Sequence, residues 1–177
     1  KIAETCPASA KGMCVANAHL MQVSLNLNDV PVGYAPPVGP AVYFQLSYNQ
    51  RGTATDAPLG PQWSHNFLAY IEDDTANPGQ NVKRVVGGGG YVLQTGYSGS
   101  SFAREIQTKA RLSRNPATGT ATSYTLNFPD GSSQTYGVTA TGTPHRLFLS
   151  SITDAQGKSL TLAYDASNRL TSIKDAT

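Results

Sequence analysis

A short internal repeat near the end of the chain most constrains what this sequence can fold into. The residues Ser-Ile-Thr-Asp-Ala at 151–155 recur as Ser-Ile-Lys-Asp-Ala at 172–176, an offset of about 21 positions, which is typical of a repeat architecture. Leu149 and Leu170 correspond at the same offset. Each unit predicts two strands joined by turns such as Asp-Ala-Gln-Gly at 154–157, and in the second strand Leu160, Leu162 and Tyr164 are expected to face one way. Because one hairpin cannot bury its apolar side alone, the units must stack.

The residues before this repeat also predict strands. Apolar and polar residues alternate over 21–27 and, most clearly, over 42–48, and a period of two is typical of half-buried strands. An Asp-Gly pair at 130–131 is a strong hairpin signal between two such runs. Further strands are predicted at residues 63–71, 82–86, 91–93, 106–112, 124–128 and 134–136.

Two segments are expected to interrupt these strands. Four prolines in residues 29–40 predict an extended surface connection, because proline removes a backbone donor and fixes φ. The four glycines at 87–90 lack the Gly-Lys-Ser/Thr continuation of a phosphate loop, so they predict a turn or bulge. Trp63 is the single tryptophan, and we expect it to anchor the core.

Composition favours an all-β fold of antiparallel hairpins. The 177 residues include 17 glycines, 11 prolines and 9 tyrosines, while only 14% are charged, a balance that favours strands and turns over helices. A chain of this length can bury one core together with a short repeat array. We predict an N-terminal segment at residues 1–20, a β region at 21–145 and the start of a repeat array at 146–177.

Charge and hydropathy exclude two classes of partner. The hydrophobic residues, 39% of the chain, occur in short runs, so no membrane span is predicted. A net charge of +2 does not indicate a nucleic-acid surface. Lys109, Arg111 and Arg114 form the closest approach to a basic cluster, and without interleaved aromatic residues we interpret it as a solvated strand end.

The two cysteines, Cys6 and Cys14, lie close together near the start of the chain. We predict a disulfide between them, which would close a short loop and contribute about 2.5 kcal/mol. Such a bond is typical of an extracytoplasmic compartment. A reduced pair stays open, because spacing alone does not bring the two Cα atoms within bridging range. A zinc site is not expected, because two thiolates leave the metal short of ligands.

No constellation of catalytic residues is evident, and we predict neither enzymatic activity nor a cofactor. The three histidines, His19, His65 and His145, occur without a metalloprotease or serine-hydrolase motif. Ser64 and His65 are adjacent in a predicted strand, so their side chains point to opposite faces. Two alternatives stay open on paper. A carboxylate pair drawn from Glu72, Asp73 and Glu105 would suit a glycosidase. Residues 72–74 could also hold calcium, but a solvated turn is the favoured interpretation, because the spacing lacks the ordered ligands of a calcium loop.

Residues 164–170 carry a specific resemblance. Tyr164 and Asp165, followed by two variable residues, Asn168, Arg169 and Leu170, closely resemble the YD repeat, in which glycine usually takes the place of Asn168. Asparagine is the next most tolerant residue for a left-handed turn, so the match is little weakened. Segments that resemble the region before the repeats in bacterial RHS proteins lie at 30–34, 48–51, 59–66 and 128–131.

The resemblance to the RHS/YD-repeat family covers roughly residues 20–177 and implies a function. Repeats of that family wind into a curved or spiralling sheet that closes into a hollow shell. It implies a secreted or cell-surface bacterial protein whose shell encloses a toxin, or whose surface mediates contact. The same resemblance implies two kinds of partner, namely other RHS segments or further copies of the chain. Either would pair with the strand edge that remains at Thr177, where the last repeat unit is cut. No catalytic residue of the family matches this sequence.

We therefore predict a structural module, either part of such a shell or a subunit of an extracellular fibre or surface layer, and the alternative is a carbohydrate-binding cell-surface module. For carbohydrate, the candidate stacking residues are Tyr34, Tyr43, Tyr91 and Tyr97, because exposed aromatic rings bind the faces of sugars. Such a site predicts coplanar exposed rings with polar neighbours. A shell or fibre predicts instead that strand edges pair between segments or subunits.

Overall fold

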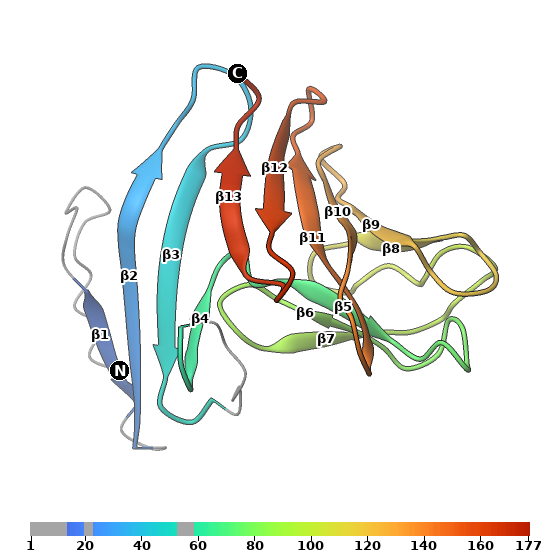
Figure 1. Ribbon diagram of the computed structural model, residues 1–177, viewed down its shortest axis with the longest axis horizontal. Helices are drawn as coiled ribbons and strands as arrows, with labels where there is room; N and C mark the ends of the chain where they lie inside the picture. The colour runs from blue at the N-terminus through green and yellow to red at the C-terminus, as the bar shows by residue number, and fades with distance from the viewer. Residues whose placement is uncertain (1–13, 20–22, 53–58) are drawn as a thin grey trace.

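The computed structural model describes residues 14–19, 23–52 and 59–177, and this part of the chain is built from strands alone (Figure 1). Every strand pair within it is antiparallel, and the larger of its two sheets is strongly curled. The predicted all-β class with a curved sheet of hairpins is therefore confirmed. Within the described ranges, no helix has the length and apolarity needed to cross a membrane.

The first sheet contains four strands in sequence order: β1 (Val15–His19), β2 (Ser24–Tyr34), β3 (Val42–Asn49) and β4 (Trp63–His65). β2 continues through the proline-rich segment that we expected to be an irregular connection, so that expectation was wrong for residues 29–34. The cause is a register shift between Asp29 and Val32, which places Pro31 in an irregularity of the strand. A proline is tolerated at such a point because the ladder needs no amide from it.

The second sheet contains the other nine strands and forks at its longest one, β11. The strand order is β7-β6-β5-β11-β10-β9-β8, and β12 and β13 form a branch. β5 pairs with residues 145–148 of β11, β12 pairs with residues 151–153, and β10 occupies the opposite edge. The bounds of these strands are β5 (Tyr70–Asp73), β6 (Val82–Val85), β7 (Tyr91–Gln94), β8 (Arg111–Asn115), β9 (Ser123–Asn127), β10 (Ser133–Thr139), β11 (His145–Thr153), β12 (Ser159–Tyr164) and β13 (Leu170–Lys174).

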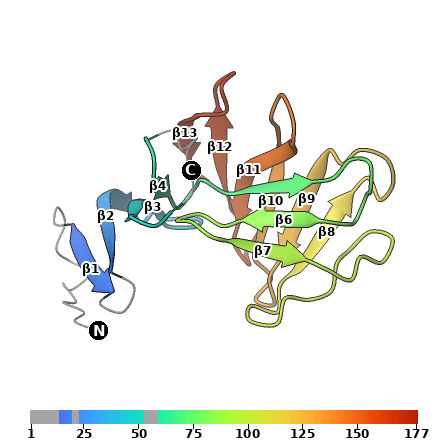
Figure 2. The same ribbon diagram turned by 90° about the horizontal axis from the view of Figure 1, so that it is seen from below.

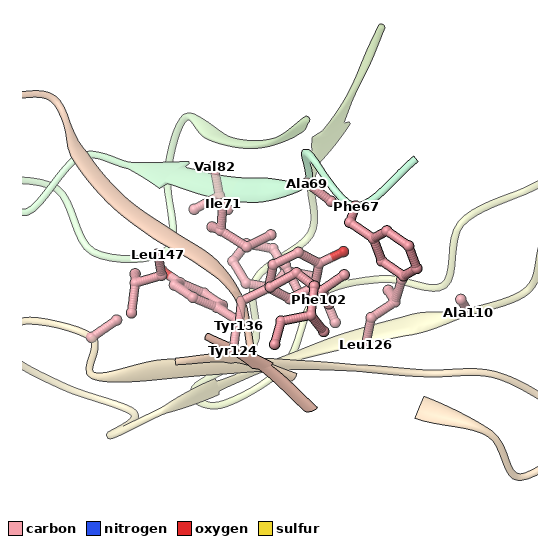
Figure 3. Close-up of a cluster of buried hydrophobic side chains, with 14 of the residues drawn as sticks. Phe67, Ala69, Ile71, Val82, Phe102, Ala110, Tyr124, Leu126, Tyr136 and Leu147 are labelled. Carbon is pink, nitrogen blue, oxygen red and sulfur yellow. The ribbon is translucent and has the colours of Figure 1, made fainter. Parts of the chain in front are cut away.

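The core fills the concave side of the curled sheet (Figure 3). Ile71 and Val82 come from the β5–β7 wing, while Tyr124, Leu126 and Tyr136 come from the β8–β10 wing, and all five are buried almost completely. Alternation along each strand explains this arrangement, since every second residue of β6, β8 and β9 points inward. Burial of side chains this large contributes about 1.5–3 kcal/mol each to folding, before the entropy cost of ordering the chain.

The connection between β7 and β8 closes one side of this core. Phe102 is buried, and its ring lies 4.9 Å from that of Tyr97 and 6.5 Å from that of Tyr124, measured between centroids. The strand predicted at 106–112 begins only at Arg111, because Ile106 lies in a turn and is 84% exposed. Apolar character alone therefore misplaced the start of β8.

The two sheets lie side by side and are joined at three places (Figure 2). Val42 of β3 belongs to the main core, and the ring of Phe44 stacks 6.3 Å from that of Phe67. At the second joint, the backbone amide of Gly88 in the β6–β7 turn donates to the carbonyl oxygen of His65, and the neighbouring Gly87 touches Asn66 so closely that any Cβ would overlap its carbonyl.

The third joint connects the β2–β3 hairpin with the end of the chain (Figure 1). The Tyr34 hydroxyl donates to Asp175 Oδ2 over 2.8 Å, and Gly39 lies against Ala176. We had expected the sole tryptophan, Trp63, to anchor the main core. It is instead half-buried and packs within the first sheet, where its ring centroid lies 5.2 Å from that of Tyr48.

Candidate functional site

The hairpin between β12 and β13 contains the sequence motif at 164–170, and its turn is organised by Asp165. One carboxylate oxygen of Asp165 accepts the backbone amides of Ser167 and Arg169 over 2.9 and 3.0 Å, and the other accepts Arg169 Nε over 2.8 Å. The amide of Asn168 donates to the Asp165 carbonyl, with Asn168 at a φ of 58°. A left-handed residue at this point closes a three-residue loop, which explains why glycine or asparagine is needed there.

Three other hairpins repeat this backbone pattern. At Asp154 the carboxylate accepts the amides of Gln156 and Lys158, and the amide of Gly157 donates to the Asp154 carbonyl. The loops at 86–90 and 128–132 have the same two backbone bonds without the aspartate in first position. The predictions of an Asp-Gly hairpin at 130–131 and of a turn at the four glycines are thus confirmed.

Hydrogen bonds to the turn aspartate stabilise its ionised form. The backbone amide of Arg169 is the main cause that holds the pKa of Asp165 below its usual range, and the Arg169 side chain and the Ser167 amide add to it. The side-chain hydroxyl of Ser132 lowers the pKa of Asp130 in the corresponding way. At neutral pH these turns therefore carry fixed negative charges, one of which Arg169 neutralises.

The other half of the motif anchors the hairpin to the sheet. The Tyr164 hydroxyl donates to the carbonyl of Leu149 over 2.8 Å, and its ring lies 5.5 Å from that of Phe148, so burial raises the pKa of this tyrosine. Leu170 packs against the core from β13. Leu160 and Leu162 share the inward face with Tyr164, as the alternation predicted. The structure thus brings the four motif residues into one hairpin, in which two side chains form the turn and two bind it to β11.

Comparison with known families bears on this same segment. The RHS repeat family matches residues 148–177, which run from the middle of β11 to the end of β13. The chain therefore carries an RHS-repeat segment over these residues. None of the curated proteins compared matches it. The RHS repeat therefore begins inside the strand that holds the curled sheet together, and the family assignment favours a structural module.

A buried polar cluster joins the two wings of the sheet that the RHS repeat extends. Tyr124 of β9 donates its hydroxyl to Asp73 Oδ2 of β5 over 2.7 Å, and the other oxygen of Asp73 contacts Nδ1 of His145 on β11. Burial is the main cause that raises the pKa of Tyr124, with the Asp73 carboxylate adding to it. A second pair links Arg84 of β6 to Glu105 over 3.1 Å. The first contact links the two wings of the curled sheet, and the second links β6 to the β7–β8 connection.

The residues considered for catalysis are engaged elsewhere. Glu72 pairs with Arg146 over 3.0 Å, so each of the three carboxylates proposed for a glycosidase has an internal partner. His65 stacks on Phe44 with ring centroids 5.1 Å apart, and burial lowers its pKa. Ser64 pairs with Ser47 and His65 with Leu46, so their side chains lie on opposite faces, as predicted.

The remaining catalytic and metal candidates lie apart. His19 contributes its backbone to β1, where it pairs with Ser24. Asp74 turns away from the sheet and accepts the amide of Ala76 and the side chain of Asn77. In the parts of the chain that the structure describes, no three His, Cys, Asp or Glu side chains are placed to hold a metal ion.

The four tyrosines proposed to stack on a ligand do not lie together. Tyr34 and Tyr43 are about half exposed but lie on opposite faces of the β2–β3 hairpin, because Tyr43 pairs with Gly33, the neighbour of Tyr34. Tyr91, 60% exposed, lies on β7 in the other sheet. Tyr97 is bound internally, with its hydroxyl donating to the carbonyls of Gly99 and Ala117. The rings therefore do not form one platform.

Cys14 is exposed at the start of the described chain, while Cys6 lies outside the described residues. The disulfide between them stays a prediction, and the boundaries at residues 20 and 145 stay predictions as well.

Sequence reasoning missed the cluster around Asp73. Its members are far apart in the chain, with Tyr124 and Asp73 separated by 51 positions. The sequence indicated only that Tyr124 points inward from its strand, not which residue it contacts.

Proposed function

We propose that this chain is a non-enzymatic structural module of a secreted or cell-surface RHS-repeat protein, and that it forms part of the wall of a β-sheet shell. The observation that carries the proposal is the continuity of the sheet. The RHS hairpin β12–β13 pairs with β11, the same strand that β5 and β10 flank, so repeat and preceding region share one sheet and one core.

The geometry of the repeat supports growth of this sheet. In the described residues β13 pairs with β12 alone, so no strand is hydrogen-bonded to its other edge, although the β2–β3 hairpin contacts residues 175 and 176 just beyond it. Asp175 already accepts the amide and hydroxyl of Thr177, the kind of contact that organises the turns at Asp154 and Asp165. A further hairpin of the same design would add to β13 and continue the curl.

A structural role also fits the chemistry of the interior. The buried Tyr124 hydroxyl binds Asp73 across the two wings, and Arg84 of β6 pairs with Glu105 in the β7–β8 connection, so the interior polar groups are engaged in holding the sheet. The exposed tyrosines are spread over two sheets, so carbohydrate binding has weaker support than sheet assembly. The RHS-repeat match supports an extracellular location, and the predicted Cys6–Cys14 bond would suit such a location.

Electron microscopy of the natively isolated protein, together with its intact mass under non-reducing and reducing conditions, tests the proposal. Hollow particles built from a parent chain longer than 177 residues support a shell wall. Fibres or rings built from an 18.7 kDa chain would replace the shell by a self-assembling subunit. Monomers that bind glycans would contradict the structural role and favour the carbohydrate alternative.

A further inference from the structure

A cleft lies along the edge strand β7, at the far end of the curled sheet from the RHS hairpin. One wall is β7 with Thr95, the other is the segment 103–107, and the volume between them is about 430 Å³. The walls meet at one end, where the amide of Ala103 donates to the Thr95 carbonyl over 2.9 Å. Beyond that bond the segment diverges from β7, so the cleft is open along the strand.

The backbone of β7 presents two free positions to this cleft. Val86 and Gly90 form a hydrogen-bonded pair at the β6–β7 turn, and hydrogen-bonded and non-hydrogen-bonded pairs alternate along an antiparallel ladder. Val92, paired with Arg84, therefore bonds to β6, whereas the N–H and C=O groups of Tyr91 and Leu93 point outward. Thr95 continues this outward series, and its carbonyl is the one that Ala103 binds.

The side chains around these positions are apolar and exposed. Tyr91 and Leu93 are 60% and 59% exposed, and Ile106 on the opposite wall is 84% exposed. Alternate residues of an extended peptide project to the same face, so a strand added to β7 would place every second side chain beside this apolar row.

The charges around the cleft favour an acidic occupant. Lys83 Nζ lies 4.7 Å from the centre of the Tyr91 ring, and Arg104 is exposed on the opposite wall. Glu105, the carboxylate that lines the cleft, is already paired with Arg84 and accepts the Thr108 hydroxyl. A second copy of the chain paired through β7 would bring the same cations to the interface, so the charges argue against self-pairing there.

We propose that β7 binds an extended peptide segment of another protein, in which apolar side chains alternate with acidic ones. The segment pairs with the outward amides and carbonyls of Tyr91 and Leu93, packs its apolar side chains on that row, and places its carboxylates near Lys83 and Arg104. This site is separate from the β13 edge and does not rest on the shell proposal.

Hydrogen exchange of the folded chain with a defined peptide tests the inference. The probe is a synthetic nine-residue peptide of alternating valine and glutamate, and the matched control replaces glutamate by lysine. The glutamate peptide is expected to slow exchange of the Tyr91 and Leu93 amides and to leave that of Val92 unchanged, because Val92 already bonds to β6. Unchanged exchange at Tyr91 and Leu93, or equal affinity for both peptides, overturns the proposal.

Two kinds of variant separate the charge and backbone contributions. Lys83→Glu and Arg104→Glu are each expected to weaken binding of the glutamate peptide about five-fold, whereas Lys158→Glu, the same change at an exposed turn residue of the β11–β12 hairpin, leaves it unchanged. Leu93→Pro removes one outward donor and is expected to weaken binding by a similar factor. If this variant fails to fold, the charge reversals still test the proposal. Equal affinity of Lys83→Glu, Arg104→Glu and Lys158→Glu for the glutamate peptide contradicts it.

Discussion

The hydroxyl of Tyr124 provides the most direct test of how the curled sheet is held. Tyr124→Phe keeps the ring in the core, where the residue is fully buried, and removes the hydroxyl that donates to Asp73 Oδ2 at 2.7 Å and that also interacts with Arg114. Asp73 is itself 7% exposed, so water does not readily replace the lost bond. A hydrogen bond to a charged group contributes about 1.5–3 kcal/mol, and we expect the variant to lose about 2 kcal/mol of unfolding free energy.

Tyr164→Phe is the control, because the hydroxyl of this part-buried tyrosine donates to the neutral backbone carbonyl of Leu149 over 2.8 Å. We expect it to lose about 1 kcal/mol. Urea unfolding followed by circular dichroism measures both losses. A double-mutant cycle with Asp73→Asn then isolates the contact, and a coupling energy of about 1 kcal/mol or more is expected. Additive effects, within roughly 0.5 kcal/mol, would refute the assigned role of the Tyr124–Asp73 contact.

Three further predictions concern particular residues. Burial lowers the pKa of His65 in the folded protein, so the unfolded chain protonates this residue at a higher pH than the folded chain does. The free energy of unfolding should therefore fall as pH drops below about 6.5, and the urea midpoints at pH 7.5 and 5.5 should differ less in His65→Phe than in the wild type. Asn168→Ala should lose about 1 kcal/mol because alanine tolerates a φ of 58° poorly, whereas Asn168→Gly should retain the wild-type thermal midpoint within a few degrees. Gly87→Ala should cost about 3 kcal/mol or more, because the new Cβ would lie 1.8 Å from the Asn66 carbonyl oxygen. Gly137→Ala should cost less, because its new Cβ would meet only the movable Ser150 hydroxyl at 3.3 Å. Equal losses of stability in thermal unfolding would contradict this assignment.

The local features of this fold were predictable because short-range physics determines them. Period-two alternation placed β3, β9 and β12, the Asp-Gly pair placed the β9–β10 turn, and the glycine run placed the β6–β7 turn. The motif at 164–170 identified the RHS repeat before the structure was known, because its turn aspartate and its anchoring tyrosine need fixed positions in the sequence.

The long-range features were not predictable from such patterns. The fork at β11 depends on one strand pairing with both β5 and β12 along the same edge, and nothing in the sequence of β11 marks the point of division. Pro31 was placed in an irregular connection, whereas β2 continues through it by means of a register shift. Ile106 resembled the start of a strand but lies in an exposed turn, because burial of its neighbours, not its own hydropathy, determines where β8 begins.

A high-resolution electron cryomicroscopy structure of the natively isolated protein tests the central claim most directly. The account predicts that the outer edge of β13 is hydrogen-bonded to a further hairpin, so that the sheet continues from β11 through β12 and β13 with the same curl. A β13 edge that faces solvent in the assembled protein, or one covered by an element other than a strand, would contradict it.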